Sequence, residues 1–178
     1  MAAFTVIDHT ELTGATASWS KTSIPSSYDH LLILASIRSS KSSAYDKVDF
    51  QMGNGSLDTG TNYSDTNLQA FNTASGAPTS GRGTGGDSID FIYISADSAT
   101  ADTFGTVKIW IPNYANTTGY KQAICTSTAP NASTSSWGMM ITAGLWSSTS
   151  AVDCVGIKET GDDLMQYSTF TLYGVTGA

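Results

Sequence analysis

Charged residues are scarce in this chain of 178 residues. Asp, Glu, Lys and Arg together make up 13% of it, about half of the usual share of roughly 25% in soluble domains. Glu occurs only at Glu11 and Glu159, and Arg only at Arg38 and Arg82. Because helices of soluble proteins draw on Glu, Lys and Arg, this shortage speaks against a helical fold.

Histidine, cysteine and long apolar runs are scarce as well. His9 and His30 are the only histidines, and no GxSxG motif is present, so nucleophilic catalysis has few candidate bases. Cys125 and Cys154 lack CxxC or zinc-ligand spacing, and we interpret them as small apolar strand residues. No run approaches the roughly 18 apolar residues of a membrane-spanning helix. The sequence therefore predicts a non-enzymatic protein with no cofactor, no metal and no membrane partner.

The start of the chain and its net charge bear on localisation and on nucleic acid. The sequence MAAFTVIDHTEL lacks the basic start and the hydrophobic segment of a secretory signal, which predicts synthesis in a cytoplasm without secretion. A net charge of -7 and a pI near 4.4 repel a phosphate backbone, and the few lysines form no stripe. Nucleic acid is therefore not expected as a partner.

Short apolar or alternating runs, bounded by Gly, Ser, Asn, Asp or Pro, recur along the chain and predict β-strands. The runs lie at 4–12, around Trp19, and at 28–38, 47–52, 62–71, 88–95, 104–111, 120–126, 137–143, 151–158 and 166–175. With no helical segments between them, they predict one all-β domain, a two-sheet sandwich of about ten strands that is jelly-roll-like.

Three segments carry finer expectations. Residues 28–38 are apolar on both faces, which predicts a central strand. In residues 47–52, Val48, Phe50 and Met52 alternate with polar residues, which predicts a strand with one wet face. Residues 72–87 are rich in Gly and small polar residues, and we expect a long outward loop of low order there.

Two acidic segments offer oxygen ligands that could bind calcium. Asp58, Asn62 and Asp65 form one set of oxygen ligands, and Glu159, Asp162 and Asp163 form the other. Neither set fits an EF-hand loop, so we interpret these residues as turn formers and predict no metal site.

Several segments resemble a family of tailed-bacteriophage virion structural proteins, which includes capsid decoration (cement), head-fibre and tail-fibre proteins. The most specific segments are IPNYANTT at 111–118 and GLWSST at 144–149, and the likeness runs from about Ala17 to Val175. The resemblance implies a β-sandwich domain at 17–178 and brings no catalytic residue with it. Residues 1–16 lie outside it, as an anchoring arm or a first strand.

The resemblance implies a structural protein of the virion surface that serves as a decoration, fibre or knob. Because a host-binding fibre needs a shaft and an attachment domain in addition to its tip, the length of one sandwich favours a capsid decoration protein, which we expect to dock on the major capsid protein as a homotrimer and to stabilise the shell. The alternative is a head-fibre or tail-fibre module that binds a host surface glycan. A polysaccharide-degrading enzyme is disfavoured because the chain has few Glu residues and no acidic residue within an aromatic-rich segment, although Asp162 and Asp163 are paired. The partner-binding residues expected from the N-terminal segment and from the aromatic positions are Phe4, Val6, Ile7, Trp110, Tyr114 and Trp146, although aromatic side chains in a sandwich more often fill the core.

Overall fold

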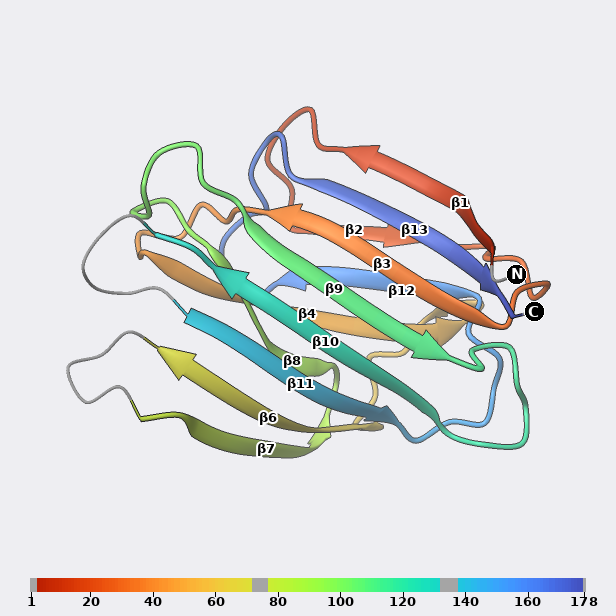
Figure 1. Cartoon of the computed structure of the whole chain (residues 1–178). Coiled ribbons are helices and arrows are strands. Elements are labelled where there is room, and N and C mark those ends of the chain that lie inside the picture. Colours follow the sequence, from red (N-terminus) through yellow and green to blue (C-terminus); the bar gives the residue numbers. More distant parts are fainter. Residues whose placement is uncertain (1–2, 72–76, 132–137, 178) are drawn as a thin grey trace.

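The computed structural model describes residues 3–71, 77–131 and 138–177, and in these residues the chain is built from β-strands without a helix (Figure 1). None of them forms an apolar helix long enough to cross a membrane. The strands are β1 (Ala3–Glu11), β2 (Ser18–Lys21), β3 (His30–Ile37), β4 (Tyr45–Asn54), β5 (Ser56–Leu57), β6 (Tyr63–Phe71), β7 (Thr79–Gly86), β8 (Ile89–Ser95), β9 (Gly105–Pro112), β10 (Lys121–Ala129), β11 (Gly138–Trp146), β12 (Cys154–Glu159) and β13 (Thr169–Thr176).

The strands form two antiparallel sheets that face each other. The wide sheet has eight strands in the order β1-β13-β3-β9-β10-β11-β6-β7. The narrow sheet has five, in the order β2-β12-β4-β5, with β8 also paired to β4. In Figure 1 the wide sheet lies in front of the narrow one. The chain is therefore a two-layer sandwich, as the composition and the runs predict.

Alternation along the strands builds one core between the layers. In β9 and β10 every second residue is buried, because its side chain points from the wide sheet toward the narrow one. Ile33 and Ile109 of the wide sheet and Phe50 of the narrow sheet are completely buried in the same hydrophobic cluster. Cys125 and Cys154 are both buried and free, in keeping with their interpretation as apolar strand residues.

The predicted fold class is confirmed, with thirteen strands rather than about ten. The predicted central strand at 28–38 is β3, which lies between β13 and β9. The strand order supports a two-sheet sandwich but not the more specific jelly-roll topology. In the wide sheet, β9, β10 and β11 follow one another as an up-and-down meander.

The predicted loop at 72–87 is wrong for its second half. β7 occupies Thr79–Gly86 and pairs with β6, whereas residues 72–76 lie outside the described residues. An edge strand needs a partner on one side only and no buried face, so glycine and hydroxyl residues suffice. Glycine at position 83 leaves room for the neighbouring strand, because a Cβ there would lie only 3.0 Å from the Asp65 carboxylate.

The predicted wet face of β4 is also corrected. Val48, Phe50 and Met52 face the core as expected, but Asp49 and Gln51 on the opposite face are buried too. The connection from β7 to β8 covers them: Gln51 Nε2 donates to the carbonyl of Asp87 at 2.8 Å. Sequence alternation shows which residues share a face, but it does not reveal a connection that crosses over that face.

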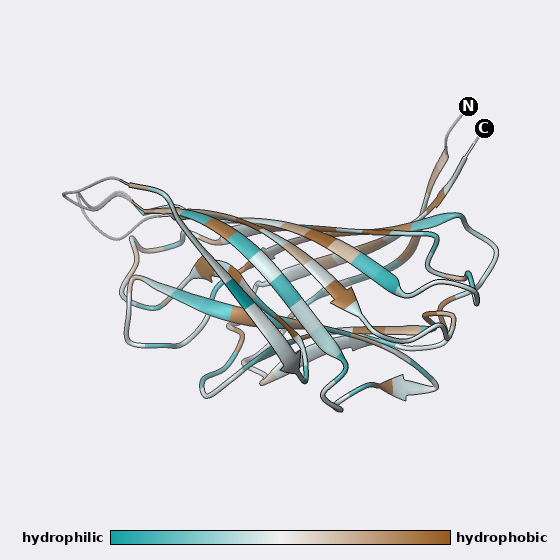
Figure 2. Ribbon diagram, turned by 90° about the horizontal axis from the view of Figure 1, so that it is seen from below, coloured by the Kyte–Doolittle hydropathy of each residue, from teal (hydrophilic) through white to brown (hydrophobic). Residues whose placement is uncertain are grey.

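The N-terminal segment is a strand and not a free arm. β1 pairs with β13 along its length, with one bulge between Val6 and Asp8. The ends of β1 and β13 project together beyond the rest of the two sheets (Figure 2). Of the two possibilities for residues 1–16, the first strand is the one observed for residues 3–11.

Candidate functional site

The outer face of the wide sheet, on the side away from the core, is a broad surface with few charged side chains. It is formed by the outward residues of β1, β13, β3, β9, β10, β11, β6 and β7. Among the outward positions of its six central strands, from β13 to β6, Lys108 is the sole Asp, Glu, Lys or Arg. Since the chain carries a net charge of -7, its acidic residues are concentrated elsewhere.

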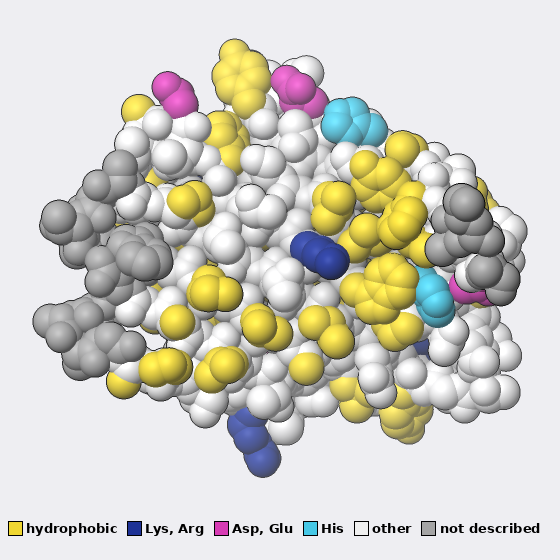
Figure 3. Space-filling model, viewed as in Figure 1, with side chains coloured by type: hydrophobic (Ala, Val, Ile, Leu, Met, Phe, Trp, Pro, Cys, Tyr) yellow, Lys and Arg dark blue, Asp and Glu magenta, His cyan; other side chains and the backbone are white. Residues whose placement is uncertain are grey.

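Exposed hydrophobic side chains gather on this outer face. Nine large hydrophobic residues are exposed among those described, and seven of them lie here: Phe4, Val6, Leu34, Leu68, Ile124, Met139 and Ile141. Figure 3 views this face and shows hydrophobic side chains spread over it, with acidic side chains at its margins. Surface hydrophobic residues scattered singly need no explanation, whereas such a gathering marks an interaction surface.

The strand register sets these side chains in rows across the sheet. One row runs from β1 to β7 through directly paired residues: Val6, Tyr173, Leu32, Trp110, Ile124, Ala143, Thr66 and Arg82. The next row runs through Thr171, Leu34, Lys108, Thr126, Ile141 and Leu68. Each row mixes apolar side chains with hydroxyls, so the face suits contact with a broad, weakly charged partner.

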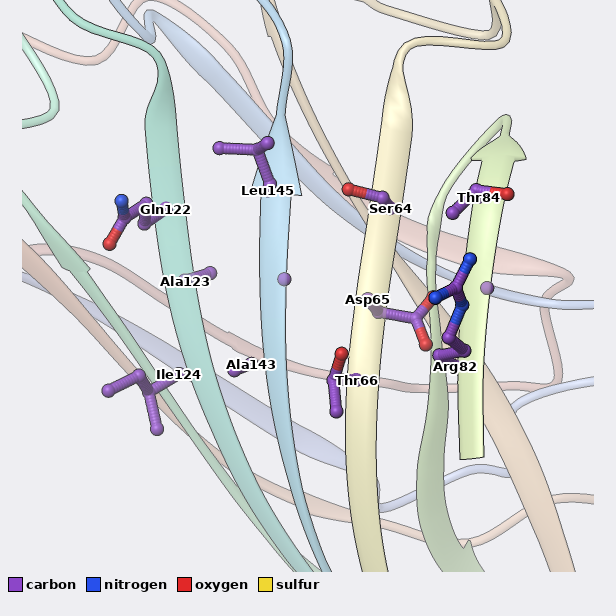
Figure 4. A pocket seen from close by; sticks show the side chains of 12 residues that line it. Ser64, Asp65, Thr66, Arg82, Thr84, Gln122, Ala123, Ile124, Ala143 and Leu145 are labelled. Carbon is purple, nitrogen blue, oxygen red and sulfur yellow. The ribbon is translucent and has the colours of Figure 1, made fainter. Parts of the chain in front are cut away.

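A shallow hollow of about 510 Å³ lies at the β7 side of this face (Figure 4). Its floor is low because Ala143, Ser64 and Thr66 are small, and it is bordered by Ile124 and Leu145 on one side and by Arg82 on the other. The lining also includes Thr84 and Gln122. The hollow therefore combines aliphatic surface with hydroxyl, amide and guanidinium groups.

Three of the six predicted partner-binding residues lie on the outer face. Phe4 is 59% exposed and Val6 is 55% exposed, and the Phe4 ring packs edge-on against Tyr173. Trp110 is half-buried beside His30 at a ring distance of 4.9 Å. Ile7 occupies the bulge of β1 and packs against the core instead.

Tyr114 and Trp146 do not belong to any surface, and their prediction as partner-binding residues is corrected. Tyr114 is completely buried, and its hydroxyl donates to the carbonyl of Pro25. Trp146 is 3% exposed, and its indole N–H donates to Asp58 Oδ2 at 2.7 Å. Both rings fill the core. Trp137 lies outside the described residues.

Sequence reasoning missed most of the outer face. The expected partner-binding residues do not include five of its exposed side chains, which are Leu34, Leu68, Ile124, Met139 and Ile141. The signal was present in the alternation: once β10 and β11 bury one set of residues, the intervening positions must point outward. Ile124 and Ile141 at such positions are apolar without being needed for the core.

The acidic residues weighed as calcium ligands fall into two different arrangements. Asp58 holds its own turn through the N–H of Gly60 and the amide of Asn62, and the Trp146 indole N–H lowers the pKa of its carboxyl. Asp65 lies apart, buried under β7. The turn-forming interpretation therefore describes Asp58 and Asn62.

The second acidic set gains a member that sequence spacing did not indicate. Carboxylate oxygens of Asp46, Glu159 and Asp162 lie within 4.8 Å of one another. Lys41 Nζ contacts Asp46 at 2.8 Å, and Glu159 accepts the backbone N–H groups of Gly161 and Asp162. Burial, and then the neighbouring Asp46 carboxyl, raises the pKa of Glu159. These contacts tie the turn after β12 to the start of β4.

Both histidines are packed as strand residues. His9 Nδ1 lies 2.8 Å from the hydroxyl of Thr171 on the neighbouring strand. His30 Nδ1 accepts the backbone N–H of Asn113 at 3.1 Å. Each imidazole thus has a local structural partner.

Comparison with known proteins adds little to this geometry. No family model and no curated protein matches the chain. One solved structure, described as a crystal structure of the Emp47p carbohydrate recognition domain, is similar at 11% identity with a TM-score of 0.31, over 98% of this chain and 87% of that one. A likeness of this strength assigns neither a ligand nor an activity to the chain.

Proposed function

We propose that this protein is a non-catalytic structural protein of a virion surface, which docks on the outer shell through the outer face of its wide sheet. The observation that carries the proposal is the outer face itself: seven exposed large hydrophobic residues share a surface whose central strands carry Lys108 as their one charged outward residue. The resemblance of 111–118 and 144–149 to virion proteins supports the choice of a shell as the partner.

The size of the face suits stable docking. Six strands spaced about 4.8 Å apart and roughly 25 Å long cover about 700 Å². Specific interfaces bury about 800 Å² on each partner. A decoration protein also gains from repetition, because many copies on a symmetric shell turn modest single contacts into a firm coat.

A charge placed in the centre of this face is expected to weaken docking strongly. Ile141 is 43% exposed and lies between Thr126 and Leu68 in its row. Ile141→Glu would bury a carboxylate without a partner in the docked complex. We therefore expect the affinity for capsid shells that carry no copy of this protein to fall about tenfold or more. Co-sedimentation of purified protein with such shells measures the loss.

The matched control places the same charge on the other sheet. Ser20 is exposed on β2 of the narrow sheet, and Ser20→Glu is expected to dock like the wild type. Equal docking of Ile141→Glu and Ser20→Glu would remove the outer face from the proposal. Failure of the wild-type chain to sediment with any shell would exclude a capsid shell as its partner.

A second candidate function is glycan binding, which the hollow beside β7 favours. Sugars present hydroxyls at their edges and C–H groups on their faces, and the hollow offers Gln122, Thr84 and Arg82 beside the aliphatic Leu145 and Ile124. These groups support a glycan site at the hollow rather than at the buried Tyr114 or Trp146, whose truncation would damage the core.

Filling the hollow tests this second function without touching the core. Ala143 is an exposed residue of β11, so Ala143→Leu occupies the floor whereas Ala143→Ser leaves it open. If a glycan binds there, binding on an array of bacterial surface polysaccharides is expected to fall about tenfold for the leucine variant and to persist for the serine variant. Equal binding by the two variants would place the glycan elsewhere.

A further inference from the structure

The edges of the two sheets differ in how well they are protected. An edge strand presents unpaired backbone N–H and C=O groups, and natural proteins cover it, shorten it or interrupt it with a bulge. β1, the first edge of the wide sheet, has a bulge between Val6 and Asp8. It is also tied to β2 by the ion pair of Lys21 with Asp8 at 3.0 Å.

The edges of the narrow sheet are protected in other ways. β2 has four residues and β5 has two, which leaves little backbone to pair. The free side of β8 is capped by side chains from the opposite sheet. Ser127 Oγ accepts the N–H of Tyr93 at 2.9 Å, and the Asp65 carboxylate accepts the N–H of Asp90.

β7 has none of these protections along most of its length. From Thr79 to Thr84 it pairs with β6 without interruption, and its bulge comes only at Gly85, where φ is +69°. On its other side, it has no hydrogen-bonding strand among the described residues. Its outward side chains are small apart from Arg82, so they do not shield the backbone.

We propose that β7 pairs with β7 of a second copy of this chain, which joins the two wide sheets into one continuous sheet across a two-fold axis. Charge favours this occupant. β7 contains no acidic residue and carries Arg82, so two chains of net charge -7 meet along a strand to which neither brings a negative charge. A copy also supplies an open edge of equal length.

The side-chain pattern selects the register. A two-fold axis perpendicular to the sheet keeps outward residues on the same side, so outward Arg82 must lie opposite an outward residue of the second copy. An axis through Arg82 would set two guanidinium groups against each other. An axis through Gly81 pairs Thr79 to Gly83 in full and sets Arg82 opposite Ser80 of the second copy.

The number of copies in the assembly follows from the number of open edges on each copy. A ring of three joined by strand pairing needs two different open edges on each copy, whereas a single open edge can only meet itself. The edge therefore gives a dimer, in place of the homotrimer expected for a shell decoration protein. This inference does not rest on shell docking, because it uses the edge of the wide sheet and not its face.

Sedimentation equilibrium of the purified chain tests the pairing with opposite charges at one position. Ser80→Glu sets a carboxylate opposite Arg82 of the second copy, and Ser80→Lys sets a cation there. Each cross-strand pair occurs twice in the dimer, so we expect the dimer to tighten about fivefold with glutamate and to weaken about fivefold with lysine. Ser80→Lys combined with Arg82→Glu again sets opposite charges against each other, so we expect it to tighten the dimer as Ser80→Glu does.

Each other outcome overturns the proposal. A chain that stays monomeric, a trimer, or a dimer that responds equally to the two charges at Ser80 would each exclude β7 pairing in this register. Ser20→Lys is the charge control on the other sheet and leaves the dimer unchanged. Loss of the dimer in Ile141→Glu, with no response at Ser80, would show that copies associate through the outer face instead.

Discussion

Arg38→Met is expected to lower the free energy of unfolding by about 3 kcal/mol, because the buried Arg38 side chain donates to several backbone carbonyls of the connection from β8 to β9. Arg38 is 6% exposed. Its guanidinium donates to the backbone carbonyls of Asp97, Thr100 and Thr103 at 2.9, 3.0 and 2.8 Å. The connection from β8 to β9 contains no large apolar residue before Phe104, so hydrogen bonds attach it to its surroundings. Besides those of Arg38, the N–H groups of Asp97 and Ser98 donate to the carbonyls of Lys41 and Ser43.

The arrangement differs from an ordinary buried ion pair. Among the described residues, no carboxylate lies within salt-bridge distance of Arg38. The positive charge is stabilised by carbonyl dipoles, including that of Ala99 at 3.3 Å. Methionine keeps most of the side-chain volume but leaves these carbonyls without their donor, and each such loss costs roughly 1 kcal/mol or more.

Arg38→Lys separates charge from geometry. The ammonium keeps the positive charge, but it is compact and cannot match a planar fork that reaches several carbonyls at once. We therefore expect lysine to recover less than half of the loss, as measured by urea unfolding. Hydrogen exchange at residues 97–103 should accelerate in both variants. Wild-type stability in Arg38→Lys, or unchanged exchange in Arg38→Met, would contradict this role.

Arg38 also shows what sequence reasoning can reach. The run at 28–38 predicts β3, and β3 is observed at His30–Ile37, since a strand pattern is a local property. The role of Arg38 depends on carbonyls some sixty residues later in the chain, and a backbone carbonyl has no sequence signature. Arginine is rare in this chain, and each of the two arginines has a distinct position. Arg38 is buried beside the connection from β8 to β9, and Arg82 lies on the edge strand β7.

The position of the exposed apolar face was only partly predictable from the sequence. The expected partner-binding residues came from the N-terminal segment and from aromatic positions, yet Tyr114 and Trp146 are in the core. An aromatic ring satisfies a core position and a surface position equally well by sequence, and only the packing decides between them. The register that sets Ile124 beside Trp110 follows from the order of the strands, which local patterns do not contain.

Asp49→Asn is expected to stabilise the protein above neutral pH by up to about 4 kcal/mol, which is the value of roughly three pKa units. Burial, followed by the negative charge of Asp90, raises the pKa of Asp49 from 3.8 to about 7. The local geometry explains why the ionised form of Asp49 is unfavourable. The Ser88 hydroxyl lies 3.3 Å from Asp49 Oδ2, 3.1 Å from Asp87 Oδ1 and 2.8 Å from Asp90 Oδ1, yet its one hydrogen can serve only one carboxylate.

The pH dependence gives the effect its sign. Since the folded state holds a proton on Asp49 that the unfolded chain releases near pH 4, stability falls as the pH rises from about 4 to about 7 and is level above that. Asparagine carries no charge at any pH, so the variant lacks this fall. The two proteins are therefore expected to unfold alike near pH 4 and to differ most at pH 8, as measured by urea unfolding across this range.

Asp90→Asn is the matched control, because it removes the negative neighbour while Asp49 stays buried. The pKa of Asp49 then remains raised by burial, so this variant should gain less stability at pH 8 than Asp49→Asn and should keep part of the fall between pH 4 and pH 7. A constant difference between Asp49→Asn and the wild type at all pH values would mean that packing, and not the proton on Asp49, sets the stability of the contact between Asp49 and Ser88.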